Sequence, residues 1–288
     1  MHHESELVGI VFDCSAVDWC CLEKRDVLPV SPVAAMEGVV IFLRTIIAGW
    51  TDKEFVLMAV SGKDSVVVFD GRPAAFDAMD ATVKVLNSVV SSTEDSQMAT
   101  AAEEAKNDAG FNSRKDSLTS SRLLIVDVSP DSAYAQQTAL FNCALTAQKT
   151  GAIVDVCSLQ LRPNSVMQQL AHLTGGSHLC WPEIIGPYRN TKALQSARPH
   201  EAFGEFLIFH CSPSWTLRKQ TGDPRWVSAS SVTMSNTARC WCHNDPQEMA
   251  FVCSSCFAVY CDGSLPSCDV CGATFTLPDM NTVASKLL

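Results

Sequence analysis

The sequence predicts an α/β protein with a doubly wound, mostly parallel sheet in the body of the chain and a small cysteine-rich module near its end. Six short runs of β-branched or apolar residues lie between Leu7 and Trp181, and helix-like stretches separate most of them. Alternating strands and helices are typical of a parallel sheet that is covered on both faces. Seven of the fourteen cysteines fall between Cys240 and Cys271, which indicates a separate module there.

The predicted strands share a strand-like length and a high content of apolar and β-branched residues. In chain order they are LVGIVFD at Leu7, FVLMAVSG at Phe55, SVVVFDG at Ser65, RLLIVDVS at Arg122, AIVDVCSL at Ala152 and SHLCW at Ser177. Such continuous apolar runs favour strands that are buried on both faces of a sheet.

The first predicted helix begins where Ser31 caps it and Pro32 opens it, and it runs to about Ala48. The apolar positions spaced for one of its faces are Val33, Met36, Val40 and Leu43. Three more helices are expected over residues 74–90, 131–149 and 164–173. Gly175 and Gly176 end the last of these, because glycine readily adopts the left-handed conformation that closes a helix.

Two segments interrupt the pattern. Residues 91–121 are polar, rich in serine and poor in large apolar groups, so they predict a flexible surface insertion. A second segment, with Trp215 and Trp226, has little periodicity and reads as a linker. The expected boundaries are 1–210 for the α/β domain with its insertion, 211–239 for the linker, 240–276 for the cysteine-rich module and 277–288 for a tail.

Composition limits the possible functions. The chain has 288 residues, of which 18% are charged, and its net charge of -10 argues against tight nucleic-acid binding. The first apolar run, Leu7–Phe12, follows two glutamates and is too short for a secretory signal, and no apolar run approaches the length of a membrane span. We therefore expect no membrane association and a reducing compartment, where many cysteines indicate metal binding rather than disulfides.

Four cysteines predict a first zinc site. Cys253 and Cys256 form one CxxC pair, Cys268 and Cys271 form another, and eleven residues separate the pairs. Each CxxC turn presents two thiolates to one ion, and two turns complete the tetrahedron of a structural zinc site. Pro266 and Gly272 suit the turns of such a module.

A second zinc site is expected on Cys240, Cys242, His243 and Cys261. Together with the two CxxC pairs these residues make eight ligands, the number that two tetrahedral sites require. Cys261 lies between the two pairs, which indicates a cross-braced, RING-like arrangement. Three ligands within CWCH are crowded, so His243 is the doubtful member. In the alternative interpretation, there is a single zinc, and Cys240, Cys242 and Cys261 pack around it.

The remaining seven cysteines are read as thiols of the core or surface, because they are scattered through apolar surroundings. From Cys240 to Leu288 the chain has five acidic residues and one lysine, so this part should not grip a phosphate backbone. Its aromatic side chains are Trp241, Phe251, Phe257, Tyr260 and Phe275. We expect some of them to form a small core and the others to contact a protein partner.

A ligand site in a doubly wound sheet is expected at the carboxyl ends of the strands, where the strand order reverses. Asp13 ends the first predicted strand and is followed by Ser15, and Asp127 ends the fourth. This pattern resembles the metal-ion-dependent adhesion site of von Willebrand A domains, which holds Mg²⁺ through oxygen ligands. Val17 stands where that motif has a second serine. We therefore expect the site to be degraded and empty, its residues capping helices and binding loop amides instead.

No catalytic motif is evident. The first strand-to-helix turn, DCSAV, lacks a glycine-rich phosphate cradle, and Asp64 follows Gly62 and Lys63 where a P-loop has serine or threonine. Neither HExxH nor GxSxG occurs, and His172 and His178 are read as structural. The sequence predicts a protein that is not an enzyme.

The order of parts resembles one family closely. A von Willebrand A body with a degraded metal site, a linker, CxCH, CxxC, a lone cysteine and CxxC resemble the smaller von Willebrand A subunit of the TFIIH core. The similarity is strongest in RLLIVDVSPDSAYAQQTALFNCALTAQKTGAIVDVCSL, in QQLAHLTGGSHL and from RCWCH to CGATF. It covers nearly the whole chain except residues 91–121 and 211–237.

The resemblance implies a noncatalytic scaffold in the nucleus that binds the larger von Willebrand A subunit and other TFIIH core subunits. Such a scaffold would support transcription initiation by RNA polymerase II and nucleotide excision repair. The alternative is a ubiquitin-pathway adapter that combines a von Willebrand A domain with a RING-like zinc module. The cysteine pattern lacks the opening CxxC and the Cys-x-His centre of a RING ligase, which favours the scaffold.

Overall fold

The chain forms two compact units, Met1–Thr233 and Met234–Leu288. The computed structural model describes residues 6–23, 30–49, 53–61, 64–71, 77–91, 120–129, 137–160, 164–185, 198–212 and most of 240–275. The expected insertion, apart from its first and last residues, lies outside the described part of the chain, as do Trp215, Trp226, Phe257 and the tail 277–288.

All six predicted strands are present in one sheet, with the order β3-β2-β1-β4-β5-β6. Their bounds are β1 Glu6–Asp13, β2 Lys53–Ser61, β3 Asp64–Gly71, β4 Ser120–Asp127, β5 Ile153–Ser158 and β6 His178–Cys180. Every neighbouring pair is parallel except β2 and β3. The chain extends the sheet first to one side of β1 and then to the other, so the predicted doubly wound, mostly parallel sheet is confirmed.

The antiparallel direction of β3 follows from the short connection before it. Only two residues separate Ser61 at the end of β2 from Asp64 at the start of β3. A connection of this length permits a hairpin, whereas a parallel neighbour requires a crossover of a dozen residues or more. β3 is therefore an antiparallel edge on an otherwise parallel sheet.

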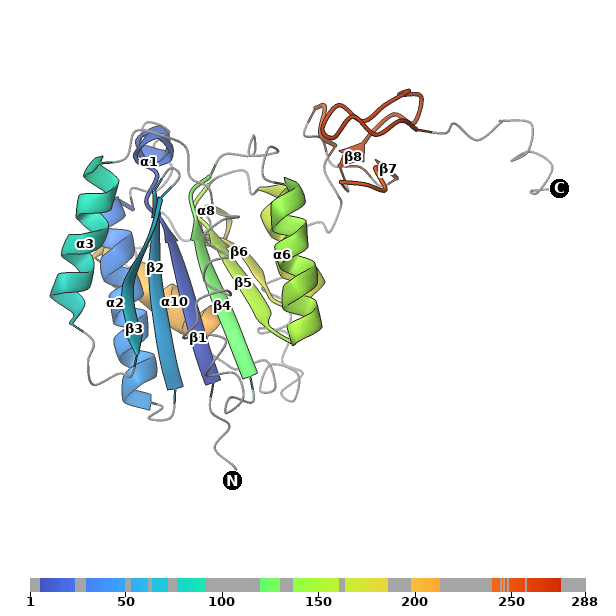
Figure 1. Ribbon diagram of the computed structural model, residues 1–288. Coiled ribbons are helices and arrows are strands. Elements are labelled where there is room, and N and C mark those ends of the chain that lie inside the picture. The colour runs from blue at the N-terminus through green and yellow to red at the C-terminus, as the bar shows by residue number, and fades with distance from the viewer. Residues whose placement is uncertain are drawn as a thin grey trace. The chain divides into compact units, whose positions relative to one another are not determined.

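Helices cover both faces of the sheet (Figure 1). Their bounds are α1 Ala16–Glu23, α2 Pro32–Gly49, α3 Ala78–Ser91, α6 Gln137–Thr150, α7 Ser165–Thr174, α8 Trp181–Ile185 and α10 Pro199–Cys211. Successive residues of β1 point to opposite faces: Ile10 and Phe12 pack with α2 and α10, whereas Leu7 and Val11 pack with α6 and α7. The long apolar run of β1 thus contributes side chains to the hydrophobic cores on both faces of the sheet.

Helix α2 matches its predicted start and end within one residue. The hydroxyl of Ser31 accepts a hydrogen bond from the N–H of Ala34 at 3.2 Å, which is the expected N-cap. Met36, Val40 and Leu43 are buried as predicted, but Val33 is exposed, so its assignment to the core face was wrong.

Helix α10 was not predicted, and it packs directly on α2. A Cβ atom added to Gly38 would come within 2.7 Å of the Phe203 ring, and one added to Gly204 within 3.0 Å of Ile41. The two glycines therefore allow the helix axes to approach closely. Within the described residues, α2 is the one helix long and apolar enough to cross a membrane. Its buried residues pack in one core with residues of β1 and α10, which accounts for that composition.

Two features of the sequence indicate the start of helix α10. Pro199 occupies its first turn, and Glu201 pairs with Arg198 at 2.8 Å. Trp181 of α8 packs edge-on against Phe203 and Phe206, with ring centroids 5.2 and 4.9 Å away. The helix extends one residue beyond the expected end of the domain at residue 210.

Helix α7 ends at the predicted glycine, and it begins one residue later than expected because Asn164 is its N-cap. The side chain of Asn164 accepts a hydrogen bond from the N–H of Val166 at 2.9 Å. Gly175 has a φ of 76° and donates its N–H to the carbonyl of His172. Glycine is suited to this left-handed position because it has no Cβ to clash.

Candidate metal centre

The cysteine-rich unit has very little regular structure. Two strands of two residues each, β7 Phe251–Val252 and β8 Val259–Tyr260, pair antiparallel. The members of its buried cluster are Cys253, Cys256, Ala258, Tyr260 and Cys268, against which Trp241, Leu265, Val270, Ala273 and Phe275 pack partly buried. Three of these five buried residues are candidate ligands, so few other side chains of the described residues pack the core of this unit.

The first predicted ligand set comes together in space. One ligand atom from each of Cys253, Cys256, Cys268 and Cys271 lies within 4.8 Å of all the others. The sulfurs of Cys253 and Cys271 are 3.7 Å apart, and those of Cys256 and Cys268 are 3.5 Å apart. Two thiolates on a tetrahedral zinc with Zn–S bonds of about 2.3 Å are separated by about 3.8 Å. The arrangement therefore fits one zinc ion.

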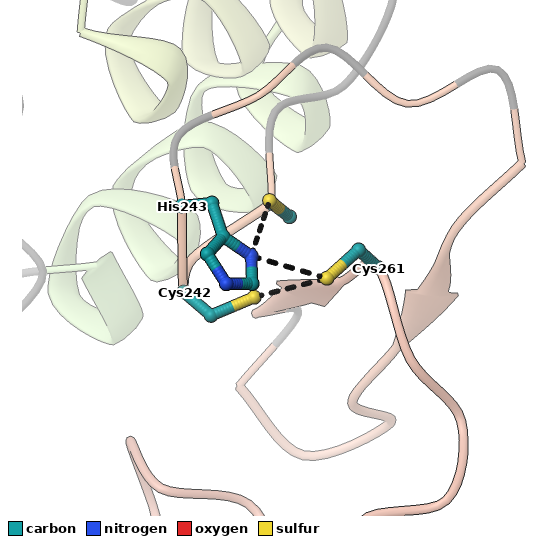
Figure 2. Close-up of side chains that lie close together, drawn as sticks. Cys242, His243 and Cys261 are labelled. Carbon is teal, nitrogen blue, oxygen red and sulfur yellow. Dashed lines mark hydrogen bonds between the residues drawn. The ribbon is translucent and has the colours of Figure 1, made fainter.

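The second predicted set also comes together, and it includes His243. Figure 2 shows the ring of His243 directed toward the sulfur of Cys261, with Nδ1 and Sγ 3.4 Å apart. Nδ1 lies 3.9 Å from Sγ of Cys240, and the sulfurs of Cys242 and Cys261 lie 3.2 Å apart. On a tetrahedral zinc a sulfur and an imidazole nitrogen are separated by about 3.6 Å. This set fits a second ion, with the two thiolates slightly closer than in a filled site.

Backbone hydrogen bonds explain how CWCH accommodates three ligands. The N–H of Cys240 donates to the carbonyl of Asp245 at 3.0 Å, five residues ahead. Cys253 and Cys268 make the same bond to residues five ahead, at 2.9 and 2.8 Å. Cys240 and His243 thus occupy the two ligand positions of a turn of CxxC length. Cys242 is the additional ligand, and the crowding expected from the sequence is relieved.

Tyr260 contacts the first ligand set from the core of the module. It is buried, and its hydroxyl oxygen lies 3.1 Å from Sγ of Cys268. The same oxygen accepts a hydrogen bond from the N–H of Asp269 at 3.1 Å, so the hydroxyl proton is free to point at the sulfur. A hydroxyl donor stabilises a thiolate and restricts its position.

One cysteine in each set is prepared to ionise near neutral pH. Burial raises the pKa of Cys268, but hydrogen bonds from the Tyr260 hydroxyl and from backbone N–H groups outweigh it and lower the pKa to about 6. Burial likewise raises the pKa of Cys240, and bonds from Asp245 and His243 lower it to about 7. Because the thiolate is the form that binds metal, these two cysteines are suited to first contact with an ion.

The donor types decide which metal suits the two sets. Four thiolates, or three thiolates and one imidazole, are soft to borderline ligands that select zinc over magnesium or calcium. Four protein ligands leave no open position, so a bound ion would be structural. Cys261 belongs to one set although it lies between the pairs of the other, which is the cross-braced order expected from the sequence.

The carboxylates at the switch point of the sheet also converge. Asp13 and Asp127 end the neighbouring strands β1 and β4, and both are fully buried. Their Oδ1 atoms accept hydrogen bonds from the N–H groups of Ser15 and Ser129, at 2.9 and 3.1 Å. The Ser129 hydroxyl contacts Asp127 and lies 3.3 Å from Oδ2 of Asp13. These side chains thus form hydrogen bonds with the N–H groups of the loops and with one another.

This cluster differs from the two cysteine sets in its geometry. Among the described residues, only the cysteine sets bring three or more His, Cys, Asp or Glu ligand atoms within 4.8 Å of one another. Burial raises the pKa of Asp127, and the charge of nearby Asp18 raises it further, whereas hydrogen bonds from Ser129 lower it. The net result is a pKa of about 6 instead of the ordinary 3.8. Val17 is exposed and carries no oxygen in its side chain.

The other cysteines and histidines are dispersed. Cys14, Cys143, Cys157, Cys180 and Cys211 are buried, and Cys20 and Cys21 are exposed. His178 is buried in β6, and burial lowers its pKa to about 4. His172 is exposed in the last turn of α7. None of these residues joins either ligand set.

Comparison with known proteins identifies the family. A family model described as transcription factor Tfb4 matches residues 97–272, more than half of the chain. The chain belongs to the Tfb4 family. The match includes all eight ligand positions of the module and ends directly after Cys271, whereas Asp13 and Ser15 lie outside it.

Individual relatives carry related names. General transcription factor IIH subunit 3 of Dictyostelium discoideum is 28% identical to the Tfb4-family chain over 156 residues, which are 54% of this chain and 36% of that protein. General transcription and DNA repair factor IIH subunit tfb4 of Schizosaccharomyces pombe is 24% identical over 297 residues, covering 96% of this chain and 90% of that protein. The chain thus spans about a third of the first relative and most of the second.

One solved structure is similar over a large part of the Tfb4-family chain. The crystal structure of the TFIIH p34 N-terminal domain is 18% identical and has a TM-score of 0.49. The similarity covers 71% of this chain and 96% of that one.

Two residues of the sites were not predicted from the sequence of this Tfb4-family chain. Asp18, buried beside the switch point, lies in the unpredicted helix α1, whose hydrophobic residues are not confined to one face. Tyr260 was assigned only to a possible core or partner surface. Its position immediately before Cys261 is the one sequence signal for a role near the metal.

Proposed function

We propose that this Tfb4-family chain is a noncatalytic scaffold subunit of the TFIIH core. The observation that supports this most directly is the module with two interleaved four-ligand sets, because the family match runs through every ligand position. The related proteins of Dictyostelium and fission yeast are named as subunits of transcription factor IIH. A closed structural zinc site supplies folding energy rather than reactivity, which suits a binding module.

The absence of enzymatic activity is part of the proposal. The switch point of the sheet is where an α/β enzyme would hold its reacting groups. Here the Oδ1 atoms of Asp13 and Asp127 accept bonds from loop amides, and both carboxylates are fully buried. Buried carboxylates that accept hydrogen bonds from the local backbone stabilise the loops that follow the strands.

The proposed partner is the larger von Willebrand A subunit of TFIIH, with further contacts to other core subunits. Through them the chain would support transcription initiation by RNA polymerase II and nucleotide excision repair, in the nucleus. Direct tight binding to nucleic acid is not part of the proposal, because the chain has a net charge of -10. The module itself contains no lysine or arginine from Cys240 to Phe275.

Copurification tests this proposal. The full-length chain, tagged at its N-terminus and expressed in its own cells, should recover the larger von Willebrand A subunit and the helicase subunits of TFIIH in comparable amounts. A Cys268→Ser variant should recover less of them, since it loses the first zinc ion and the folding energy that this ion supplies to the module. A Cys20→Ser variant, which changes an exposed thiol of the body, serves as the matched control. Recovery of a ubiquitin-conjugating enzyme without any TFIIH subunit would contradict the scaffold.

A further inference from the structure

The zinc module exposes a short apolar strip. Met249 and Phe251 are 87% and 57% exposed and lie two residues apart, the spacing at which side chains of an extended segment share a face. Val252 is 55% exposed but follows Phe251 directly in β7, so its side chain points to the opposite face. The other described aromatic side chains of the module, Trp241, Tyr260 and Phe275, pack into its small core. The structure thus separates the aromatic residues that stabilise the module from the one that faces solvent.

Phe251 is held in place although it is exposed. A Cβ atom built on Gly263 would lie 2.4 Å from the ring of Phe251. The ring therefore lies directly over the backbone of that glycine. Its own backbone pairs with Tyr260 in the two-stranded sheet. A fixed, exposed aromatic ring loses little conformational entropy when a partner covers it, which is a property of residues that dominate interfaces.

A negative charge lies beside the strip. Asp262 immediately precedes Gly263, the residue over whose backbone the Phe251 ring lies. The carboxylate of Asp262 accepts hydrogen bonds from the N–H and hydroxyl of Ser264, at 2.9 and 2.6 Å. Asp245 and Asp269 are also exposed, and the module has no positive side chain to neutralise them.

We propose that the strip of Met249 and Phe251 is a docking surface for a segment of another protein that carries apolar side chains flanked by lysine or arginine. The apolar part of such a segment would cover Phe251, and its basic part would pair with Asp262. The inference rests on the proposed function only in taking that protein to be a subunit of the same complex. A segment of this kind fits because the exposed residues offer apolar area and negative charge together.

Site-specific photocrosslinking tests the surface in the assembled complex. The full-length chain is prepared with p-benzoylphenylalanine in place of Phe251, and in a second preparation in place of Met249. Phe209, an exposed aromatic residue of the body, is replaced in the control. Crosslinked peptides are identified by mass spectrometry after purification of the complex, and zinc content is measured to show that each variant is folded.

We expect both module positions to crosslink to one segment that contains apolar residues and at least one lysine or arginine, and the control to miss that segment. An Asp262→Lys variant should weaken binding of the synthetic peptide of that segment by about tenfold, with zinc content unchanged. Crosslinks to residues 276–288 of the same chain, to a second copy of the chain, to an acidic segment or to nothing would overturn the inference. If the complex assembles but the strip stays uncrosslinked, this inference alone fails; if the wild-type chain recovers no TFIIH subunit, the proposed function fails.

Discussion

The hydroxyl oxygen of Tyr260 lies 3.1 Å from Sγ of Cys268, a member of the first ligand set. Tyr260 is followed directly by Cys261, a ligand of the other set. Its backbone pairs with Phe251 in the sheet, and its ring packs against Trp241 and Phe275. Tyr260 therefore links the two ligand sets: its side chain contacts the sulfur of Cys268, and its backbone leads directly into Cys261.

Replacing Tyr260 by phenylalanine should loosen the first site without unfolding the module. The variant keeps the ring but removes the donor to the Cys268 sulfur and leaves the N–H of Asp269 without its acceptor. Loss of such an outer hydrogen bond lowers metal affinity by about tenfold. Zinc transfer to a chromogenic chelator should be faster by a similar factor. Ser264→Ala, which removes a hydroxyl bonded only to Asp262, is the control, and equal transfer rates in the two variants would contradict the assigned role of Tyr260.

Replacing Gly38 by alanine should destabilise the α/β domain. The added methyl group would meet the Phe203 ring at 2.7 Å and the backbone of α10 at 3.1 Å, so the two helices would have to separate. Overpacking of this kind costs about 1–3 kcal/mol. Gly49→Ala in the last turn of α2, where an added Cβ meets nothing within 4 Å, is the control. Urea unfolding that shows the same midpoint for both variants would mean that α2 and α10 do not pack as described.

Asp127 should make the stability of the domain fall as pH rises from about 4 to about 6. Its folded pKa of about 6 exceeds its ordinary value of 3.8, so the folded chain binds more protons than the unfolded chain in this range. Stability therefore decreases with rising pH there, by roughly 3 kcal/mol in total if Asp127 acted alone. Asp127→Asn keeps an acceptor for Ser129 without the charge. Thermal unfolding of this variant should lack that part of the pH dependence, and an unchanged profile would show that Asp127 is ionised normally.

Magnesium should not stabilise the α/β domain. Thermal unfolding of the full-length chain is expected at the same temperature in Mg²⁺-free buffer and in excess Mg²⁺, because Val17 supplies no oxygen ligand at the switch point. Asp13→Ala should still lower stability by about 1–3 kcal/mol, since the N–H of Ser15 loses its buried acceptor. A magnesium-dependent rise in the unfolding temperature that disappears in the Asp13→Ala variant would reveal a working metal site.

The strands were predictable because each is an apolar run whose length and neighbours leave few alternatives. The run LVGIVFD became β1, in which alternate residues enter two separate cores. Helix α10 was missed because its apolar residues, including Phe203 and Leu207, are not confined to one clear stripe, and Gly204 lowers its intrinsic helix propensity. Its place is determined by the tertiary contact of Gly38 with Gly204, which no local pattern contains.

The ligand sets were predictable from spacing alone, because a CxxC turn brings two sulfurs together whatever surrounds it. His243 was expected in the second set but was its doubtful member, because the bond from the N–H of Cys240 to the carbonyl of Asp245 that shapes the turn cannot be read from spacing. The contact between Tyr260 and Cys268 likewise depends on how β8 faces the second CxxC turn. Spacing identifies candidate ligands, whereas the groups that orient them appear only in three dimensions.

The number of zinc ions bound by the full-length chain tests the account most directly. Native mass spectrometry, supported by elemental analysis, should find two zinc ions per wild-type chain and one per chain in a Cys261→Ser variant that retains the first site. Cys268→Ser should lose the first ion. A wild-type chain that binds a single zinc would remove Cys240, Cys242, His243 and Cys261 as a separate site, and a chain that binds none would contradict the zinc module altogether.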